Sequence, residues 1–167
     1  MKDITYKEDN IKFNFRVAVI IENNERILVQ HSEGDTNERL IGGRVKLLEN
    51  TAQALVREIK EELNYEAKEE ELTLLQIAEN FFDYHDTEDI LQKVHEILFI
   101  YKLYINSNEE IAQKDNFKEL DKANITFKWI NKQEIKNTKL VPDLAKRVID
   151  EEKINYDIIN DLREIRK

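Results

Sequence analysis

The order of hydrophobic and polar residues predicts a strand near the start of the chain. Residues 13–21 carry an apolar side chain at every second position, and the residues between them change from polar to apolar along the segment. The alternating apolar residues are Phe13, Phe15, Val17, Val19 and Ile21. This pattern indicates a strand buried on one face at its start and on both faces at its end. Asn23 and Asn24 then form a turn, and residues 26–30 are the hairpin partner.

Further strands are predicted in the second half of the chain. Residues 72–84 and 94–104 are rich in β-branched and aromatic residues, with residues 85–89 as the turn between them. Residues 125–130 form a last strand, and Pro142 can begin a helix that runs to about residue 150. Strands and helices in this order predict an α/β fold in which a mixed sheet lies between helices.

The clearest helical pattern covers residues 52–63, which contain neither glycine nor proline. Thr51 or Asn50 can cap its start, and Asn64, which tolerates a left-handed backbone, can end it. Glu58, Glu61 and Glu62 fall within an arc of ~100° on this helix. The neighbouring side is apolar and faces the core. Its residues are Ala52, Leu55, Val56, Ile59 and Leu63.

Glutamates on one helical face repel one another, by roughly 0.2–0.5 kcal/mol for a pair at i, i+4. A hard divalent cation would offset this repulsion, because Mg²⁺ prefers oxygen ligands and is usually completed by waters and substrate phosphates. The alternative is an ordinary solvated acidic face, which is common in a chain with 35 acidic residues. The glutamates alone do not decide between the two interpretations.

The end of the chain has a second helical pattern, in which apolar residues recur at intervals of 4, 1, 3 and 3 positions among charged ones. These residues are Ile154, Ile158, Ile159, Leu162 and Ile165. The pattern predicts an amphipathic C-terminal helix at about residues 153–166. Its apolar stripe either packs on the parent domain or forms the contact of a homodimer.

Length and composition indicate that residues 1–167 form one compact domain, because the chain is long enough for one well-buried core and too short for two. The net charge of −9 and pI near 5.0 argue against general nucleic-acid binding. The absence of cysteine excludes disulfides, zinc–thiolate sites and a cysteine nucleophile. No apolar run approaches the ~18 residues of a membrane span, and residues 1–10 are too charged for a signal peptide. We therefore expect a soluble, cytoplasmic protein that does not associate with membranes.

The helical glutamates belong to a longer pattern. Gly43 is followed after five residues by Glu49, and after seven more by the run REIKEE at residues 57–62. This spacing resembles the box of the Nudix hydrolases, G-x5-E-x7-R-E-U-x-E-E-x-G-U, in which U is a bulky aliphatic residue. Asn64 and Tyr65 stand where that box has a glycine and an aliphatic residue. Asparagine is the mildest replacement for a glycine with positive φ, and Tyr65 concerns packing rather than metal binding.

The resemblance to this MutT-like, bacterial type of family implies the Nudix fold, a mixed, curved β-sheet between α-helices. It implies metal binding by Glu58, Glu61 and Glu62, with the carbonyl of Gly42 as a further ligand. The catalytic residues would be Glu58, Glu61 and Arg57, and Glu58 is the candidate general base toward water.

The remaining box positions resemble the part of the family's site that supports the ligands. Arg57 and Glu49 match the structural pair in which the arginine orients the loop and its glutamates, and Gly43 belongs to the same support. Positioning of this kind typically changes affinity or activity 10–100-fold.

The second half of the chain adds weaker candidates. The segment from Asn80 resembles the paired strands that line the cleft in bacterial relatives, where the acidic residue after His95 often approaches the metal. Glu96 is therefore a fourth candidate carboxylate, and a strand-edge glutamate facing water is the alternative. His95 fits a structural hydrogen-bonding role as readily as a catalytic one. Glu119 lies in a long loop where some relatives carry a catalytic acid, and a solvated glutamate is the alternative.

Substrate contacts are predicted from basic and aromatic residues. Arg16 and Arg44 are candidates for positioning the distal phosphate. Phe81, Phe82 and Tyr84 could stack on a nucleobase, although a sheet core would use the same residues, and we expect at least one of each alternating pair to lie in the core.

Together these features predict a pyrophosphohydrolase that needs Mg²⁺, or Mn²⁺ as a substitute. Linked phosphates repel hydroxide, so their hydrolysis at neutral pH requires cations that neutralise oxygens and activate water. The substrate would be a small nucleoside diphosphate derivative such as a nucleoside triphosphate, a nucleotide sugar or ADP-ribose. The alternative is a non-catalytic Nudix-like domain that senses a nucleotide derivative, but such domains usually lose box glutamates that this chain retains.

Overall fold

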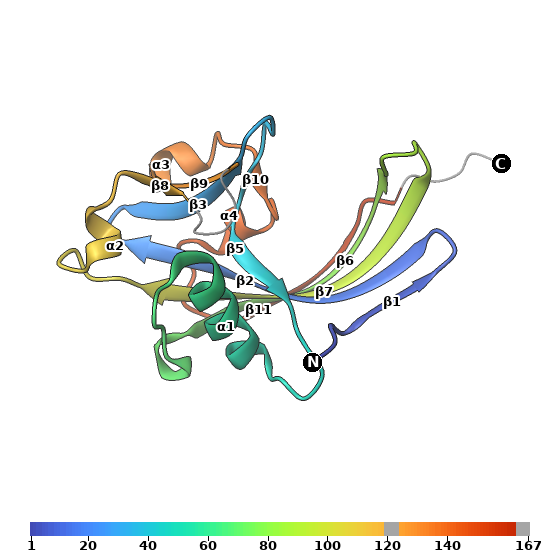
Figure 1. The fold of residues 1–167 in the computed structure, drawn as a ribbon, viewed down its shortest axis with the longest axis horizontal. Coiled ribbons are helices and arrows are strands. Elements are labelled where there is room, and N and C mark those ends of the chain that lie inside the picture. The colour runs from blue at the N-terminus through green and yellow to red at the C-terminus, as the bar shows by residue number, and fades with distance from the viewer. Residues whose placement is uncertain (119–123, 163–167) are drawn as a thin grey trace.

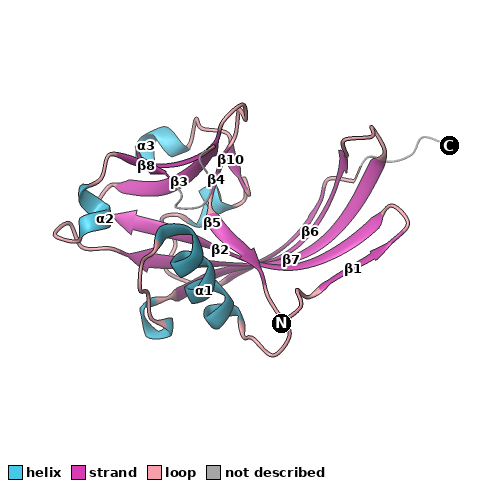
Figure 2. Ribbon diagram, viewed as in Figure 1, coloured by secondary structure: helices cyan, strands magenta, loops and turns pink. Residues whose placement is uncertain are grey.

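The computed structural model describes residues 1–118 and 124–162, in which eleven strands form one mixed sheet with short helices around it (Figures 1 and 2). The strands are β1 (Thr5–Glu8), β2 (Ile11–Asn23), β3 (Arg26–Ser32), β4 (Glu38–Arg39), β5 (Ile41–Arg44), β6 (Thr73–His85), β7 (Leu91–Tyr104), β8 (Asn116–Lys118), β9 (Ile125–Asn131), β10 (Leu140–Val141) and β11 (Asn155–Asn160). The helices are α1 (Thr51–Leu63), the 3₁₀ turn η1 (Glu69–Glu71), α2 (Glu110–Gln113), α3 (Lys132–Ile135) and α4 (Ala145–Val148). The predicted strands and the predicted central helix are confirmed.

Strand β2 is the central element of the sheet, whose main path runs β10-β4-β3-β2-β7-β6-β11. One edge of β2 pairs in parallel with β7 along nearly its whole length, and β7 pairs antiparallel with β6. The other edge pairs antiparallel with β1, then β5, then β3. The first half of β2, the last half of β6 and the first half of β7 extend together with β1 as a curved arm (Figure 1).

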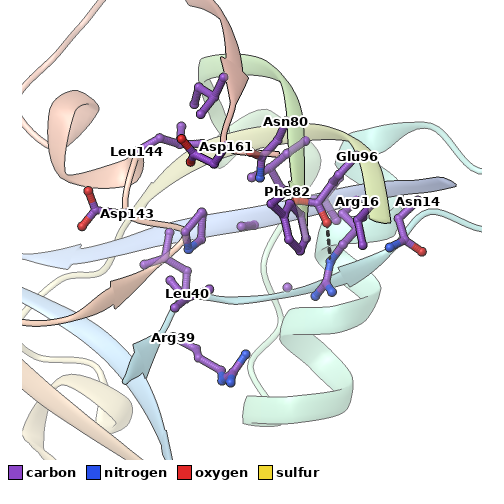
Figure 3. Close-up of a pocket in the computed structure, with 18 of the residues that line it drawn as sticks. Asn14, Arg16, Arg39, Leu40, Asn80, Phe82, Glu96, Asp143, Leu144 and Asp161 are labelled. Atoms are coloured by element: carbon purple, nitrogen blue, oxygen red, sulfur yellow. Dashed lines mark ion pairs between the residues drawn. The ribbon is translucent and has the colours of Figure 1, made fainter. Parts of the chain in front are cut away.

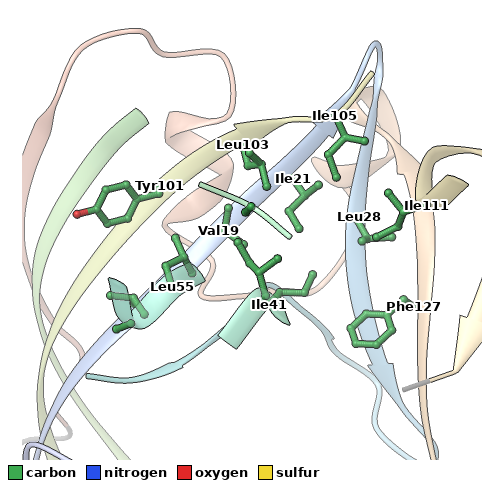
Figure 4. Packing of buried hydrophobic residues seen from close by; sticks show 14 of the residues in the cluster. Val19, Ile21, Leu28, Ile41, Leu55, Tyr101, Leu103, Ile105, Ile111 and Phe127 are labelled. Carbon is green, nitrogen blue, oxygen red and sulfur yellow. The ribbon is translucent and has the colours of Figure 1, made fainter. Parts of the chain in front are cut away.

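The first core lies between this sheet and α1 (Figure 4). Val17, Val19 and Ile21 point from β2 toward α1, which buries Leu55 and Ile59 against them. These are the alternating positions at which the sequence predicts a buried face. The core fixes which side of α1 remains free to carry carboxylates.

The second core lies on the opposite face of the sheet. Ala18 and Ile20 of β2 pack there with Ala145 and Val148 of α4 and with Ile149. The sheet thus has helical segments on both faces, and the expected mixed α/β arrangement is confirmed. No helix in the described parts of the chain is long and apolar enough to cross a membrane.

Helix α1 begins and ends where its sequence predicts. The side chain of Asn50 accepts a hydrogen bond from the backbone N–H of Gln53, and Gln53 reciprocates in a capping box. Asn64 ends the helix in the left-handed conformation, with φ of 53°. The hydroxyls of Thr51 and Tyr101 lie 2.6 Å apart and join the start of the helix to β7.

The predicted C-terminal helix at residues 153–166 is wrong over its central part, where β11 pairs in parallel with β6. The apolar intervals fit a helix, but β6 presents an open edge whose N–H and C=O groups require partners. Isoleucines and Tyr156 are also good strand formers, so the tertiary context overrides the helical spacing. Residues 163–167 lie outside the described part. The helix expected from Pro142 is likewise limited to the four residues of α4.

Candidate active site

Arg57, in the middle of α1, connects the parts of the site. Its Nε and Nη2 atoms donate to the two carboxylate oxygens of Glu49 at 2.7 and 3.0 Å, and Nη2 also donates to the carbonyl of Arg44 at 3.0 Å. Its Nη1 donates to Glu58 at 2.7 Å and to Glu61 at 3.3 Å. The hydrogen bonds from Arg57 lower the pKa of the Glu49 carboxyl, and those with Glu49 raise the pKa of Arg57. Arg57 therefore holds β5, the following loop and two helical glutamates in one arrangement.

Two glycines in β5 leave room for this arrangement. A Cβ on Gly43 would lie 2.1 Å from a carboxylate oxygen of Glu58, so any side chain would displace that glutamate. Gly42 has φ of +154°, and a Cβ there would lie 2.2 Å from the carbonyl oxygen of Val17. The paired glycines are thus required by close approach, the first to β2 and the second to α1.

The three box glutamates differ in exposure. The side chain of Glu58 is 14% exposed and that of Glu61 53% exposed, with Lys46 Nζ 3.8 Å from Glu61. Glu62 is half-buried. Among residues 1–118 and 124–162, no three acidic or histidine side chains converge closely enough to hold an ion. Glu58 and Glu61 instead face Arg57. Their hard oxygen donors suit Mg²⁺, but a cation would compete with Arg57 for them.

A pocket of about 600 Å³ opens on the sheet face opposite α1 (Figure 3). Its floor is formed by successive inward-facing residues of adjacent strands. These are Lys12, Asn14 and Arg16 of β2, Val94, Glu96 and Leu98 of β7, and Asn80, Phe82 and Tyr84 of β6. Leu40, Pro142 and Leu144 belong to the other wall. Gly42 also lines the pocket, whereas a side chain on its neighbour Gly43 would meet Glu58, so the glycine pair lies between the pocket on one face of the sheet and the glutamates on the other.

Glu96 lies in the pocket rather than beside the box glutamates. It is buried, and its carboxylate lies 3.9 Å from Arg16 Nε, as the dashed line in Figure 3 marks. Burial raises the pKa of the Glu96 carboxyl, while the charge of Arg16 and a hydrogen bond from Asn80 oppose that rise. Because Glu58 approaches Gly43 from the α1 face, the strand register separates Glu96 from it across the sheet. We therefore leave Glu96 out of the candidate ligand set.

The aromatic candidates divide between the two faces of β6. Phe82 and Tyr84 line the pocket, whereas Phe81 is not among the residues that line it. Phe81 instead stacks on His95 with ring centroids 4.3 Å apart, and Phe13 meets the same ring edge-on at 5.3 Å. His95 thus packs between aromatic rings on the α1 side. Glu119 lies outside the described residues.

Arg16 and Arg44 line the pocket, and their role in positioning a phosphate stays a prediction. Sequence reasoning missed Lys12, Asn14 and Asn80, which lie on the same floor. A signal for two of them was present, since Lys12 and Asn14 share the alternating polar positions of β2 with Arg16. Asn80 has no such signal, because its place depends on the pairing of β6 with β7.

Residues 12–151 match the family described as the NUDIX domain. The chain belongs to the NUDIX family. The MutT protein of Bacillus halodurans has a similar fold, with a TM-score of 0.63 and 16% identity, over 86% of each chain. A NUDIX hydrolase from Nitrosomonas europaea gives a TM-score of 0.55 at 18% identity, over 88% of this chain and 78% of that one. A NUDIX-family hydrolase from Clostridium perfringens gives 0.52 at 17% identity, over 82% and 96%.

At these identities the solved structures show the fold alone, and no curated protein matches the chain. Membership of the NUDIX family makes the chain a pyrophosphohydrolase of nucleoside diphosphate derivatives. NUDIX hydrolases generally use divalent metal ions and act on small nucleotide substrates. The α1 glutamates and the neighbouring pocket are the features of this chain that suit those two requirements.

Proposed function

We propose that this NUDIX hydrolase cleaves a diphosphate linkage in a nucleoside triphosphate, nucleotide sugar or ADP-ribose in the presence of Mg²⁺, with Mn²⁺ as a substitute. The observation that carries the proposal is the glycine pair, because Gly42 borders the pocket and Gly43 contacts Glu58. At this point no side chain of β5 lies between the pocket and Glu58, because both residues are glycines.

The proposed ligands of the cation are Glu58, Glu61, Glu62 and the carbonyl of Gly42. When bound, a divalent cation lowers the pKa of water and neutralises phosphate oxygens. The carboxylate and carbonyl oxygens of the proposed ligands are hard donors, which Mg²⁺ prefers. Glu58 is the proposed general base, since a glutamate carboxylate at this position can accept a proton from the attacking water.

The other residues position these groups and the substrate. Arg57 holds Glu58 and Glu61 through Nη1 and is itself held by Glu49. Arg16 and Arg44, both lining the pocket, are proposed to bind substrate phosphate through charge-assisted hydrogen bonds. Phe82 and Tyr84 offer aromatic surface on which a nucleobase can stack. We also propose a cytoplasmic location and leave homodimerisation as a prediction.

The test is a screen for turnover with Mg²⁺ and with Mn²⁺. The substrates are nucleoside triphosphates, ADP-ribose, nucleotide sugars and dinucleoside polyphosphates, and the products are identified. Glu61→Gln and Glu62→Gln should each lower kcat about 100-fold or more, because each removes a charge that would hold the cation. Glu70→Gln is the matched control, since Glu70 is exposed in η1 outside the box, and it should retain full activity.

Two outcomes would contradict the proposal. Near-normal turnover of either box variant at low Mg²⁺ would show that the assigned glutamates do not hold the cation. Binding of nucleotides without turnover of any of them with either ion would instead favour a sensing domain.

A further inference from the structure

Three cations line one side of the pocket floor and form what we term the basic strip: Lys12 and Arg16 of β2 and Arg44 of β5. Arg44 pairs directly opposite Arg16 in the sheet. Asn14 lies between Lys12 and Arg16 on the same face, and Figure 3 shows Asn14 and Arg16 side by side. The strip therefore follows β2 from the glycine pair out into the curved arm.

Two of the three cations in the strip have a carboxylate partner, and the third has none in the described parts of the chain. Arg16 has Glu96 at 3.9 Å, and Arg44 has Asp3 at 3.4 Å. Lys12 forms no ion pair with any residue in the described parts of the chain. Burial lowers the pKa of the Lys12 ammonium, and the nearby charges of Arg44, Lys7 and Arg16 lower it further. Such a concentration of cations in a chain with net charge −9 favours an anionic ligand.

The length of the strip indicates more than one diphosphate. Gly42 lines the pocket and pairs with Ala18, two residues beyond Arg16, so the end of the strip at Arg16 and Arg44 lies beside the glycine pair on the pocket face of the sheet. Lys12 is four residues farther along β2, which corresponds to roughly 13 Å of extended strand. A diphosphate held at the glycine pair does not extend that far, and no carboxylate of residues 1–118 or 124–162 forms an ion pair with Lys12, which can therefore take another anionic group.

We infer that Lys12, together with Arg16 and Arg44, binds a further phosphate, so that the substrate is a nucleoside diphosphate derivative with at least one additional phosphate group. This inference rests on the proposed function, because it takes the glycine pair as the cleavage site. It selects phosphate-rich nucleotides over nucleotide sugars and ADP-ribose, which carry only the diphosphate.

The inference is tested first by binding without catalysis. Inorganic tripolyphosphate and pyrophosphate are titrated into the protein by calorimetry in EDTA. Lys12→Gln should weaken tripolyphosphate binding about tenfold, since it removes one charge-assisted contact, and change pyrophosphate binding less than about twofold. Lys93→Gln is the matched control, because Lys93 lies on the same arm but its position in β7 alternates with the pocket residues Val94 and Glu96. It should leave both affinities unchanged.

Equal weakening by Lys12→Gln and Lys93→Gln would overturn the inference, because it would show a general charge effect. Tripolyphosphate binding no tighter than pyrophosphate binding would also overturn it. Turnover measurements distinguish a failure of the further phosphate site from a failure of the proposed function. If the wild type hydrolyses diphosphate substrates while Lys12→Gln has no selective effect, the further phosphate site is wrong and the proposed function stands. Selective loss in Lys12→Gln supports the phosphate site even if no tested nucleotide is turned over.

Discussion

Leu48 has an unfavourable backbone conformation for its side chain. It lies in the loop between β5 and α1 with φ of 66°, and it is 97% exposed, so no packing offsets the strain. A left-handed conformation destabilises the folded state by about 1–2 kcal/mol for a residue with a Cβ. Glycine avoids this strain, but the greater flexibility of the unfolded chain offsets part of the gain. We expect Leu48→Gly to raise the free energy of unfolding by about 0.5–1 kcal/mol and Tm by about 1–4 °C in thermal unfolding.

The neighbouring leucine provides the control. Leu47 is also exposed but has no positive φ, and its N–H donates to the carbonyl of Lys2. Leu47→Gly should therefore lower Tm, because glycine adds only flexibility there. If both glycine variants are destabilised alike, the left-handed conformation of Leu48 does not limit stability.

Glu96 gives a pH-dependent prediction. Burial raises its pKa, so the folded protein binds this proton more tightly than the unfolded chain does. Its contribution to stability is present below the ordinary pKa of glutamate and is lost as the pH rises through the raised value. Above that value the wild type carries a buried charge that Glu96→Gln lacks. The variant should have the higher Tm near pH 7, and the difference should vanish toward about pH 4.

Thermal unfolding in EDTA across this pH range is the measurement, with Glu70→Gln as an exposed control that shows no such trend. A lower Tm for Glu96→Gln at neutral pH would mean that pairing with Arg16, at 3.9 Å, outweighs the effect of burial.

The residues of the box were predictable because their roles are local. Gly43, Glu49 and Arg57 are fixed by spacing within one loop and one helix, and their contacts follow from that short segment. The choice between Phe81 and Phe82 was not predictable. A register irregularity between Leu74 and Gln76 reverses which face of β6 the alternate residues occupy. The sequence alone does not reveal that shift.

The same contrast holds for whole elements. Helix α1 has a cap, an uninterrupted apolar stripe and a left-handed stop, which agree with one another and with the structure. Strand β11 has apolar spacing that fits a helix, and its actual state depends on the free edge of β6, about 80 residues away in the chain. A local sequence pattern predicts a helix or strand well when its conformation does not depend on pairing with a distant segment of the chain.

Two adjacent isoleucines test the state of β11. In the strand, Ile159 is partly buried against the second core while Ile158 is 64% exposed on the other face. We expect Ile159→Asp to lower the free energy of unfolding by about 1–3 kcal/mol, because it places a charge against apolar side chains, and Ile158→Asp to change it by less than about 0.5 kcal/mol. Chemical denaturation measures both. Similar losses for the two variants would favour the helix, in which both residues belong to the apolar stripe.

At the scale of the molecule, the pocket could not be predicted in detail because its floor comes from separate segments of the chain. Residues 12–16, 80–84 and 94–98 become neighbours only through the parallel pairing of β2 with β7 and the antiparallel pairing of β7 with β6. The acidic composition of the chain gives no sign of the basic strip. Net charge describes the whole surface, whereas ligand binding depends on the few charges that the fold gathers.

Cation binding should also stabilise the whole molecule. An ion that binds the folded state and not the unfolded chain adds about 2.7 kcal/mol at a concentration 100 times its Kd, which for a domain of this size raises Tm by roughly 5–10 °C. We expect Mg²⁺ to produce such a rise in thermal unfolding and EDTA to reverse it. Glu61→Gln and Glu62→Gln should lose most of the rise. In EDTA, Glu61→Gln should change the free energy of unfolding by less than about 1 kcal/mol, because the ion pairs of the exposed Glu61 with Arg57 and Lys46 are weak. Glu70→Gln should respond to Mg²⁺ as the wild type does. A rise of equal size in all variants would place the cation away from the box glutamates, even if those variants had lost activity.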